Sequence, residues 1–256
     1  MHRTRRSLLK GSALLAASAS GAQTTSASSL EGASASLVAD ALRKVGHDPR
    51  RLTMSTDIRP VAGHTGPIVG PAVTTKWELT REGMSSAAIR RFVFEPVDEA
   101  PAGSIWIIES GTERLLSMFG DVIGLACQRK GMAGAITDSG CRDVAAMESY
   151  GFPVFAKGTV LYGPGNAIRP VAANVPIVCG GVDVGPGDVV VADNDGVIVV
   201  HRMCSSKLPV PRTSFKSMKT RRDRSSKPGS RLRKPIRCEE DGCSRGNSKC
   251  CCSSRC

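Results

Sequence analysis

The sequence contains few aromatic residues, 4% of 256, and only four histidines, none of them paired at a metal-ligand spacing. The motifs of triad hydrolases, zinc proteases, phosphate-binding loops and dinucleotide-binding folds are absent from it. No apolar run approaches the roughly 18 residues of a membrane span, which excludes a polytopic membrane protein. With 41% hydrophobic residues, the chain is neither wholly disordered nor a collagen or coiled coil. We therefore expect one good-sized globular domain or two small ones.

Positive charge is unevenly distributed along the chain, whose formal net charge is +12. Residues 204–256 contain 15 of the 35 Lys and Arg residues but only 4 of the 23 Asp and Glu residues. Four further basic residues lie in the first ten positions, so 16 basic and 19 acidic residues remain in residues 11–203. This mildly acidic region lacks the electrostatic footprint of a protein that binds phosphate backbones, and we expect no nucleic-acid partner for it.

The first residues are typical of an export signal. Residues 5–10 read Arg-Arg-Ser-Leu-Leu-Lys, and a weakly apolar stretch then leads to small residues suited to cleavage near Ala22. This order resembles the twin-arginine signal, which implies a periplasmic or secreted protein. A mitochondrial presequence is also rich in Arg and Ser, so mitochondrial and cytoplasmic locations are the alternatives. We assign residues 1–29 to the signal and a polar linker.

Apolar patterning predicts one α/β domain over residues 30–203. Helices are expected at 34–45, 115–129 and 144–150, and strands at 104–110, 133–137, 152–156, 175–179, 189–192 and 197–200. The Asp-Asn-Asp-Gly segment at 193–196 predicts a hairpin turn, with a calcium loop as the alternative. Strands that alternate with helices and then give way to a β-rich end indicate mixed sheets.

The cysteines divide into two groups. Cys127, Cys141 and Cys179 lie in apolar surroundings, which is typical of buried structural thiols and not of catalytic ones. The other seven of the ten cysteines lie in residues 204–256.

Polar residues gather at the ends of predicted elements between Gly120 and Asp143. Residues 120–123 open or interrupt a helix, where exposed amide N–H groups can bind a carboxylate. Arg142 offers a planar fork to a carboxylate, and Asp143 offers hard oxygen to a divalent ion. Adjacent side chains point apart unless they hold both ends of one ligand. The alternative is that Asp143 caps the next helix beside a surface Arg142.

Residues 120–123, together with Gly-Met-Ala-Gly-Ala-Ile-Thr-Asp-Ser-Gly-Cys-Arg-Asp at 131–143, resemble the core of the 4-hydroxy-4-methyl-2-oxoglutarate aldolase family. That family also contains the RraA-like regulators of ribonuclease activity. Residues 151–156 and 180–200 resemble its later blocks, and the similarity extends over about residues 34–202. The resemblance implies a swivelling β/β/α domain that assembles as trimers, or as hexamers made from them, with sites near the subunit boundaries.

The resemblance to the aldolase members also implies roles for individual residues. Backbone amides of four residues would bind the substrate carboxylate: Gly120, Asp121, Val122 and Ile123. Arg142 would bind the 2-oxo acid, and Asp143 would hold Mg²⁺ or Mn²⁺, partly through water. Asp121 would help to position a metal-bound water for proton transfer. The family pattern thus implies a class II aldolase, in which the cation stabilises the pyruvate enolate that C–C cleavage leaves. Oxaloacetate decarboxylation needs the same stabilisation.

One position departs from the family pattern. Aldolase-type members usually have an acid three residues beyond the Arg-Asp pair, where this chain has Ala146. Glu148 lies two positions further and would point elsewhere on a helix. The competing hypothesis is a non-catalytic regulatory or binding protein of the ribonuclease-regulator type on the same scaffold. Those members lack an intact Arg-Asp pair, so the presence of Arg142-Asp143 favours catalysis.

Residues 204–256 have almost no apolar periodicity, which predicts a disordered, basic, Cys-rich tail outside the working domain. A zinc module would need paired ligand spacings such as C-x₂-C, which the tail lacks. A nucleic-acid-binding tail would fit the charge but has no interleaved aromatic residues. An abnormal terminus, such as a shifted reading frame, fits the abrupt change in composition at the point where the resemblance ends.

We expect Arg5→Lys/Arg6→Lys to leave the precursor in the cytoplasm, because the twin-arginine pathway reads the arginine pair itself. Fractionation of cells and N-terminal sequencing of the product would measure this. The unaltered chain serves as the control, and equal export and processing of both chains would contradict the assignment.

Overall fold

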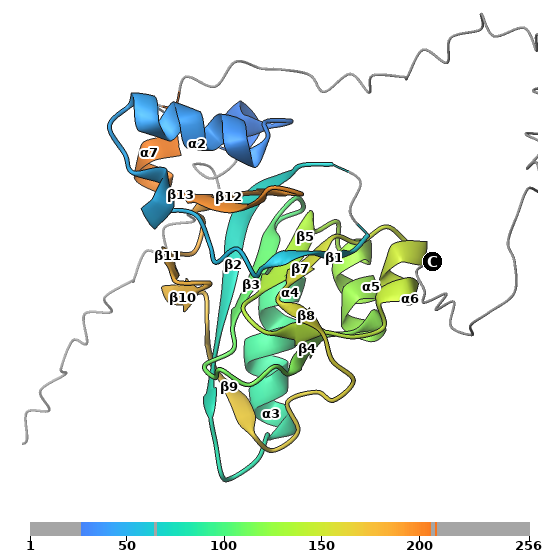
Figure 1. Cartoon of the computed structure of the whole chain (residues 1–256). Coiled ribbons are helices and arrows are strands. Elements are labelled where there is room, and N and C mark those ends of the chain that lie inside the picture. The colour runs from blue at the N-terminus through green and yellow to red at the C-terminus, as the bar shows by residue number, and fades with distance from the viewer. Residues whose placement is uncertain (1–26, 64–65, 206–207, 209–256) are drawn as a thin grey trace, which may run out of the picture. The chain divides into compact units, whose positions relative to one another are not determined.

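An eight-stranded mixed sheet runs through the centre of the protein (Figure 1). Its strands, in spatial order, are β1 (Arg59–Ala62), β7 (Val154–Ala156), β5 (Gly134–Thr137), β3 (Ile105–Glu109), β2 (Ile68–Leu79), β12 (Val189–Asp193) and β13 (Gly196–Val200), with β9 (Ile168–Ala173) also paired to β2. The computed structural model describes residues 27–63, 66–205 and 208. The predicted export signal up to residue 26 and most of the basic tail therefore lie outside the described residues.

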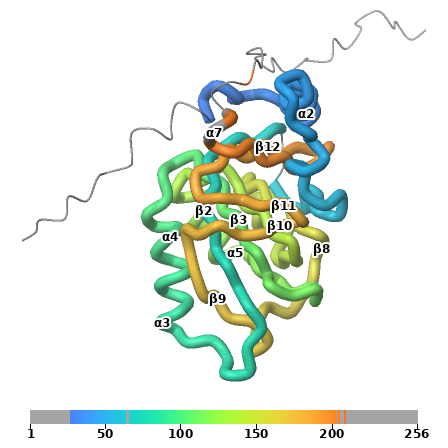
Figure 2. The backbone as a smooth tube through the Cα atoms, turned by 90° about the vertical axis from the view of Figure 1, so that its left-hand side faces the viewer, coloured from blue at the N-terminus to red at the C-terminus, as the bar shows by residue number. Residues whose placement is uncertain are grey.

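Helices and two small sheets surround the central sheet (Figure 2). The helical elements are η1 (Ser28–Leu30), α2 (Ala35–Lys44), η2 (Pro49–Arg51), α3 (Ser86–Ile89), the π-helical turn η3 (Arg90–Phe94), α4 (Glu95–Glu99), α5 (Asp121–Arg129), α6 (Val144–Ser149) and α7 (Arg202–Ser205). The small sheets are β4 (Ser117–Phe119) with β6 (Gly140–Cys141) and β8 (Gly158–Thr159), and β10 (Ile177–Cys179) with β11 (Val182–Val184). No helix in the described part of the chain is long and apolar enough to cross a membrane.

Strand β3 contributes side chains to two core layers, one on each face of the central sheet. It pairs in parallel with β2 and β5, and its residues 105–108 are buried on both faces, as in sheets covered on both sides. Trp106 and Ile108 pack with side chains from the helical elements η3, α4, α5 and α6. Ile105 and Ile107 face the other way and pack with β10 and β11. The alternation of side chains along a strand therefore produces both layers.

The predicted turn at 193–196 is confirmed, because β12 and β13 form an antiparallel hairpin with Asp193 opposite Gly196. One face of this hairpin packs into the same core layer as β10 and β11. The other face packs against α2, which begins where the Ser34 hydroxyl accepts a hydrogen bond from the Leu37 amide (3.3 Å). The helix expected at 34–45 is therefore also confirmed, and α2 covers the outer face of the hairpin.

A π-helical turn between α3 and α4 has a clear cause in Pro96. Proline has no N–H and cannot donate to the carbonyl of Phe92, four residues earlier. The Thr75 hydroxyl donates to that carbonyl instead (3.4 Å), and its oxygen accepts a hydrogen bond from Trp106 Nε1 (2.8 Å). The buried sheet thus holds the irregular turn in place. Apolar patterning alone predicts neither this helical segment nor β9.

The helix predicted at 115–129 is wrong in its first part. Residues 117–119 form β4, which pairs in parallel with β6, and the helix α5 begins only after Gly120. Met118 and Phe119 are both buried, so this stretch has no polar face that would distinguish a strand from a helix. Pairing with a strand that lies about twenty residues further along the chain decides its conformation.

The C-terminal end of the domain is fixed by the buried carboxylate of Asp188. It accepts hydrogen bonds from the amides of Gly185 (2.8 Å) and Arg202 (2.9 Å), and it lies 3.0 Å from His201 Nδ1. Beyond these contacts, Leu208 is 8% exposed and packs in the core layer beneath α2. Packed residues therefore continue a short way past the domain boundary that we predict at residue 204.

We expect Leu208→Ala in the full chain to lower the free energy of unfolding by about 2 kcal/mol, because it removes a buried side chain from a packed layer. Leu79→Ala is the matched control, since Leu79 is 63% exposed and its loss should change stability little. Urea unfolding under reducing conditions would measure both variants. Equal stability of the two would show that the packed domain ends before residue 208.

Candidate functional site

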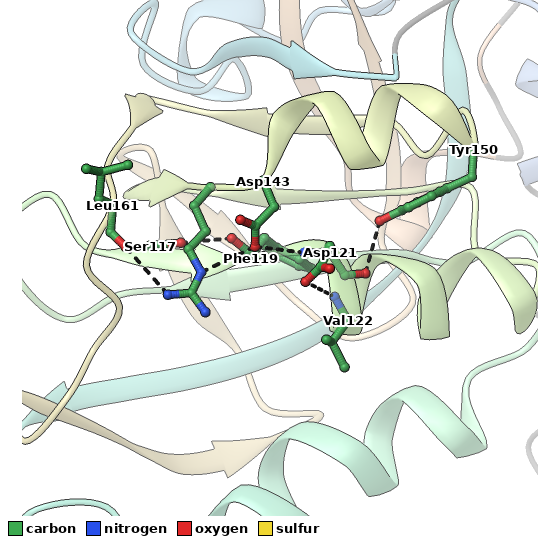
Figure 3. Close-up of polar contacts among 8 residues, drawn as sticks. Ser117, Phe119, Asp121, Val122, Asp143, Tyr150 and Leu161 are labelled. Carbon is green, nitrogen blue, oxygen red and sulfur yellow. Dashed lines mark hydrogen bonds and ion pairs between the residues drawn. The ribbon is translucent and has the colours of Figure 1, made fainter.

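The predicted site residues converge because two parallel strands end side by side. Strand β4 leads through Gly120 into α5, and its neighbour β6 leads through Arg142 and Asp143 into α6. The Arg142 amide donates to the carbonyl of Phe119 (2.9 Å), which continues the pairing to the last residue of β4. The starts of α5 and α6 are therefore adjacent, although about twenty residues separate them in the sequence (Figure 3).

Asp143 has an unusual backbone conformation that directs its side chain. Its φ and ψ angles are 57° and 35°, in the left-handed region that few residues other than glycine adopt. Asp143 occupies the N-cap position of α6, as the capping interpretation expects, but its carboxylate makes no capping bond to that helix. Oδ2 instead accepts a hydrogen bond from the Asp121 amide (3.2 Å) and lies 3.4 Å from Arg142 Nε. The two adjacent side chains thus meet on one side, because the turn at Asp143 breaks the alternation of an extended chain.

Gly120 is required for space and not for its backbone angles. Its φ and ψ of −152° and −175° are extended and suit any residue. A β-carbon at this position, however, would lie 2.7 Å from Asp143 Oδ2 and 3.3 Å from Arg142 Nε. The close approach of the two charged groups to α5 therefore depends on a residue without a side chain.

The amides at the start of α5 already face carboxylates. The Asp121 amide donates to Asp143, and the Val122 amide donates to Asp121 Oδ1 (2.7 Å). The Ile123 amide has no acceptor within the described part of the chain. This helix start therefore donates to the protein's own carboxylates, and a substrate carboxylate would have to replace them.

Arg142 borders an open pocket of about 510 Å³. Its side chain is 51% exposed, and Nη1 lies 3.5 Å from the Leu161 carbonyl. The remaining lining comes from the residues at the start of α6, from the end of β8 and from the loop after it: Asp143, Val144, Thr159, Val160 and Leu161. Because the Arg142–Asp143 ion pair is half-exposed, it adds under about 1 kcal/mol to stability. Both groups can therefore turn to a ligand at little cost.

Tyr150 is a site residue that the sequence analysis missed. It follows α6, and its hydroxyl donates to the backbone carbonyl of Asp121 (3.1 Å; Figure 3). Partial burial raises the pKa of Tyr150, and the charges of Asp121 and Asp143 add to the effect. The sequence did contain a signal for Tyr150. It lies four residues after Ala146, the position where the family pattern usually has an acid, and this spacing places both residues on one face of the helix.

Other candidate groups stand apart from the site. Glu148 lines a different pocket, beside Pro60 and Ala62, as expected from its place on α6. Burial raises the pKa of Cys127 to about 12 and that of Cys141 to about 11, so these thiols are structural, as predicted. Among the described residues, no group of three or more His, Cys, Asp or Glu side chains gathers as a set of metal ligands.

Comparisons with known proteins identify the family of this chain. The RraA-like family model, described as Aldolase/RraA, matches residues 35–199. The chain belongs to this family. A Halalkalibacterium halodurans protein provisionally named 4-hydroxy-4-methyl-2-oxoglutarate aldolase is 33% identical over 155 residues, which cover 58% of this chain and 66% of that protein. An uncharacterised Methanocaldococcus jannaschii protein is 30% identical over 153 residues, covering 57% of this chain and 66% of that protein.

A solved structure extends the similarity to the fold. It is a Streptomyces coelicolor protein described as an unusual member of the RNase ES inhibitor RraA protein family. Its sequence is 26% identical, its TM-score is 0.60, and the match covers 71% of this chain and 86% of that one. The family and the mixed α/β fold that we expected are confirmed. The names of the family members divide between an aldolase and a ribonuclease inhibitor, so membership does not by itself assign an activity.

We expect Gly120→Ala to displace Asp143 from the Asp121 amide, since the new methyl group would take the position that the carboxylate needs. Because this bond joins exposed groups, its loss should lower the free energy of unfolding by at most about 1 kcal/mol and should shift the Asp121 amide signal in ¹⁵N spectra. Gly66→Ala is the control, because a methyl group there would meet no atom within 4 Å. An unmoved Asp121 signal in Gly120→Ala would contradict the contact.

Proposed function

We propose that this protein is a divalent-cation-dependent lyase that cleaves a C–C bond in small 2-oxo acids and releases pyruvate. Substrates of the 4-hydroxy-4-methyl-2-oxoglutarate type are the first candidates, with oxaloacetate decarboxylation as a second activity. The proposal rests on one observation: Arg142 and Asp143 lie on the same side, against the start of α5. A guanidinium, a half-exposed carboxylate and a helix start would then face one small substrate.

The residues present fit a hydrated Mg²⁺ or Mn²⁺ ion. Mg²⁺ usually keeps several waters and is bound through one or two carboxylates together with substrate oxygens. Asp143 is 39% exposed and borders the pocket, and Gly120 leaves the space beside its Oδ2 free of a β-carbon. Two carboxylates, those of Asp143 and Asp121, lie at the site and would be enough for an ion that keeps several of its waters. When bound, the cation would supply positive charge beside the 2-oxo oxygen, where negative charge develops as the bond breaks.

The chain's own residues would bind and orient the substrate. The planar fork of Arg142, which lines the pocket, suits the carboxylate of a 2-oxo acid. The amides of Val122 and Ile123 add the partial positive charge of a helix start on the other side of that carboxylate. The Asp121 carboxylate, once replaced at the Val122 amide, would accept the proton of the substrate hydroxyl and return a proton to the product.

The same resemblance supports two further proposals about the working protein. Val122 and Leu161, which flank the site, are 79% and 87% exposed, and a second copy of the chain in a trimer or hexamer would cover such apolar side chains. The predicted twin-arginine signal would place the lyase outside the cytoplasm, away from a cytoplasmic ribonuclease. A regulatory or binding protein on this scaffold is the competing function.

We expect pyruvate release from 4-hydroxy-4-methyl-2-oxoglutarate or oxaloacetate, abolished by EDTA and restored by Mg²⁺ or Mn²⁺. Asp143→Asn and Arg142→Lys should each lower kcat/KM by at least about 100-fold, since each removes a charge or a fork aimed at the developing negative charge. Glu148→Gln is the matched control, because this carboxylate of α6 lines another pocket.

Absence of metal-dependent turnover of both substrates by the unaltered protein would contradict the lyase. A rise in melting temperature with oxalate and Mg²⁺, without turnover, would instead favour the binding or regulatory protein.

A further inference from the structure

The hydroxyl of Tyr150 links the two helices of the site, because it bonds from the end of α6 to the backbone of α5. It donates to the carbonyl of Asp121, the first residue of α5, from a position just after α6. Long side chains on a helix lean toward its N-terminus, so the phenol of Tyr150 extends back toward the end of α6 at which Asp143 lies. The bond therefore lies near the site, although Tyr150 follows Asp143 by seven residues.

The neighbouring turn of α5 is shaped to receive this hydroxyl. A β-carbon on Gly124 would lie 2.7 Å from the Tyr150 oxygen, and 3.2 Å from Met147 Sδ. Glycine within a helix is unfavourable compared with alanine, so its presence at a buried helical position indicates a need for space. Gly124 and Tyr150 thus form a complementary pair.

We propose that Tyr150 is a positioning residue of the site: its hydroxyl holds the first turn of α5, with the amides and carboxylate of Asp121–Ile123, in register with Arg142 and Asp143. This inference rests on the proposed function. Small displacements of groups that bind the substrate carboxylate cost much activity, so a single bond to the backbone of this turn suffices for the role. Ala146, one turn earlier on the same face of α6, has no group that could reach α5.

A double-mutant cycle tests the inference. Tyr150→Phe removes the hydroxyl, and Gly124→Ala places a methyl group where the hydroxyl lies. Each should lower kcat/KM by about tenfold, and the double variant should be no worse than either single one, because both act through the same contact. Ser149→Ala is the control, since its hydroxyl bonds only within α6, to the carbonyl of Ala146 (2.7 Å).

Stability separates positioning from a merely structural role. Gly124→Ala also brings its methyl group within 3.2 Å of the buried Met147 Sδ, so Tyr150→Phe is the variant for this comparison. It removes one exposed hydrogen bond and should lose activity with little change in melting temperature. If its loss of activity instead follows a fall in melting temperature, or if Tyr150→Phe keeps full kcat and KM, the inference is wrong.

A titration reports whether Tyr150 lies beside Asp121, without any turnover. The chain has only two tyrosines, so in Tyr162→Phe the phenolate absorbance belongs to Tyr150 alone. Partial burial and the nearby charges should hold its pKa above the ordinary value of about 10, and the pKa should fall in Asp121→Asn/Tyr162→Phe, because one of those negative charges is removed. A pKa that ignores Asp121 would show that Tyr150 lies away from the start of α5 and would overturn the inference. A pKa that responds to Asp121, in a protein that turns over neither substrate, would show that the two residues are neighbours and that both the lyase and the positioning role are wrong.

Discussion

The hydrogen bond from the Asp121 amide to the Asp143 carboxylate joins the two segments on which the site depends. It spans 3.2 Å between groups that are themselves exposed, so its own contribution to stability is small. It forms because β4 and β6 pair in parallel and because Asp143 adopts a left-handed backbone conformation that turns its side chain toward α5. Without that turn, Arg142 and Asp143 would face opposite sides, and one ligand could not meet both groups.

The rigidity that this weak contact requires comes from the layers beneath it. Phe119 ends β4 and Cys141 ends β6, and each is at most 1% exposed. Both pack in the same layer as Trp106 and Met147. The ends of buried strands thus set the backbone at Gly120 and Arg142, and only the last polar atoms reach solvent. The polar groups of the site are therefore held in place and need little reorganisation on binding, while the apolar layers supply the stability of the fold.

The sequence predicts those parts of the fold that a local pattern can specify. The doubly buried run of β3, the Asp-Asn-Asp-Gly hairpin and the capped helix α2 each have such a pattern, and residues 120–123 with 142–143 could be singled out as a site. No local pattern marks β4, whose conformation depends on a distant strand, or the left-handed angles of Asp143. Tyr150 was missed because its partner is a backbone carbonyl on another helix, which only the packing of α5 on α6 brings within reach.

The charges around the site bear on the substrate that it suits. Arg142 contributes one positive charge, and Asp121 and Asp143 contribute two negative charges. An acid in place of Ala146 would contribute a third negative charge. A divalent cation would change the sum of the three charges present from −1 to +1, and a substrate with two carboxylates, such as oxaloacetate, would then bring it to −1. With a third acid the same complex would be one unit more negative and would oppose more strongly the further charge that develops on the 2-oxo oxygen. Under the proposed function, Ala146 in place of an acid would therefore oppose an anionic 2-oxo acid less, and the neutral hydroxyl of Tyr150 would hold α5 at this site without adding charge.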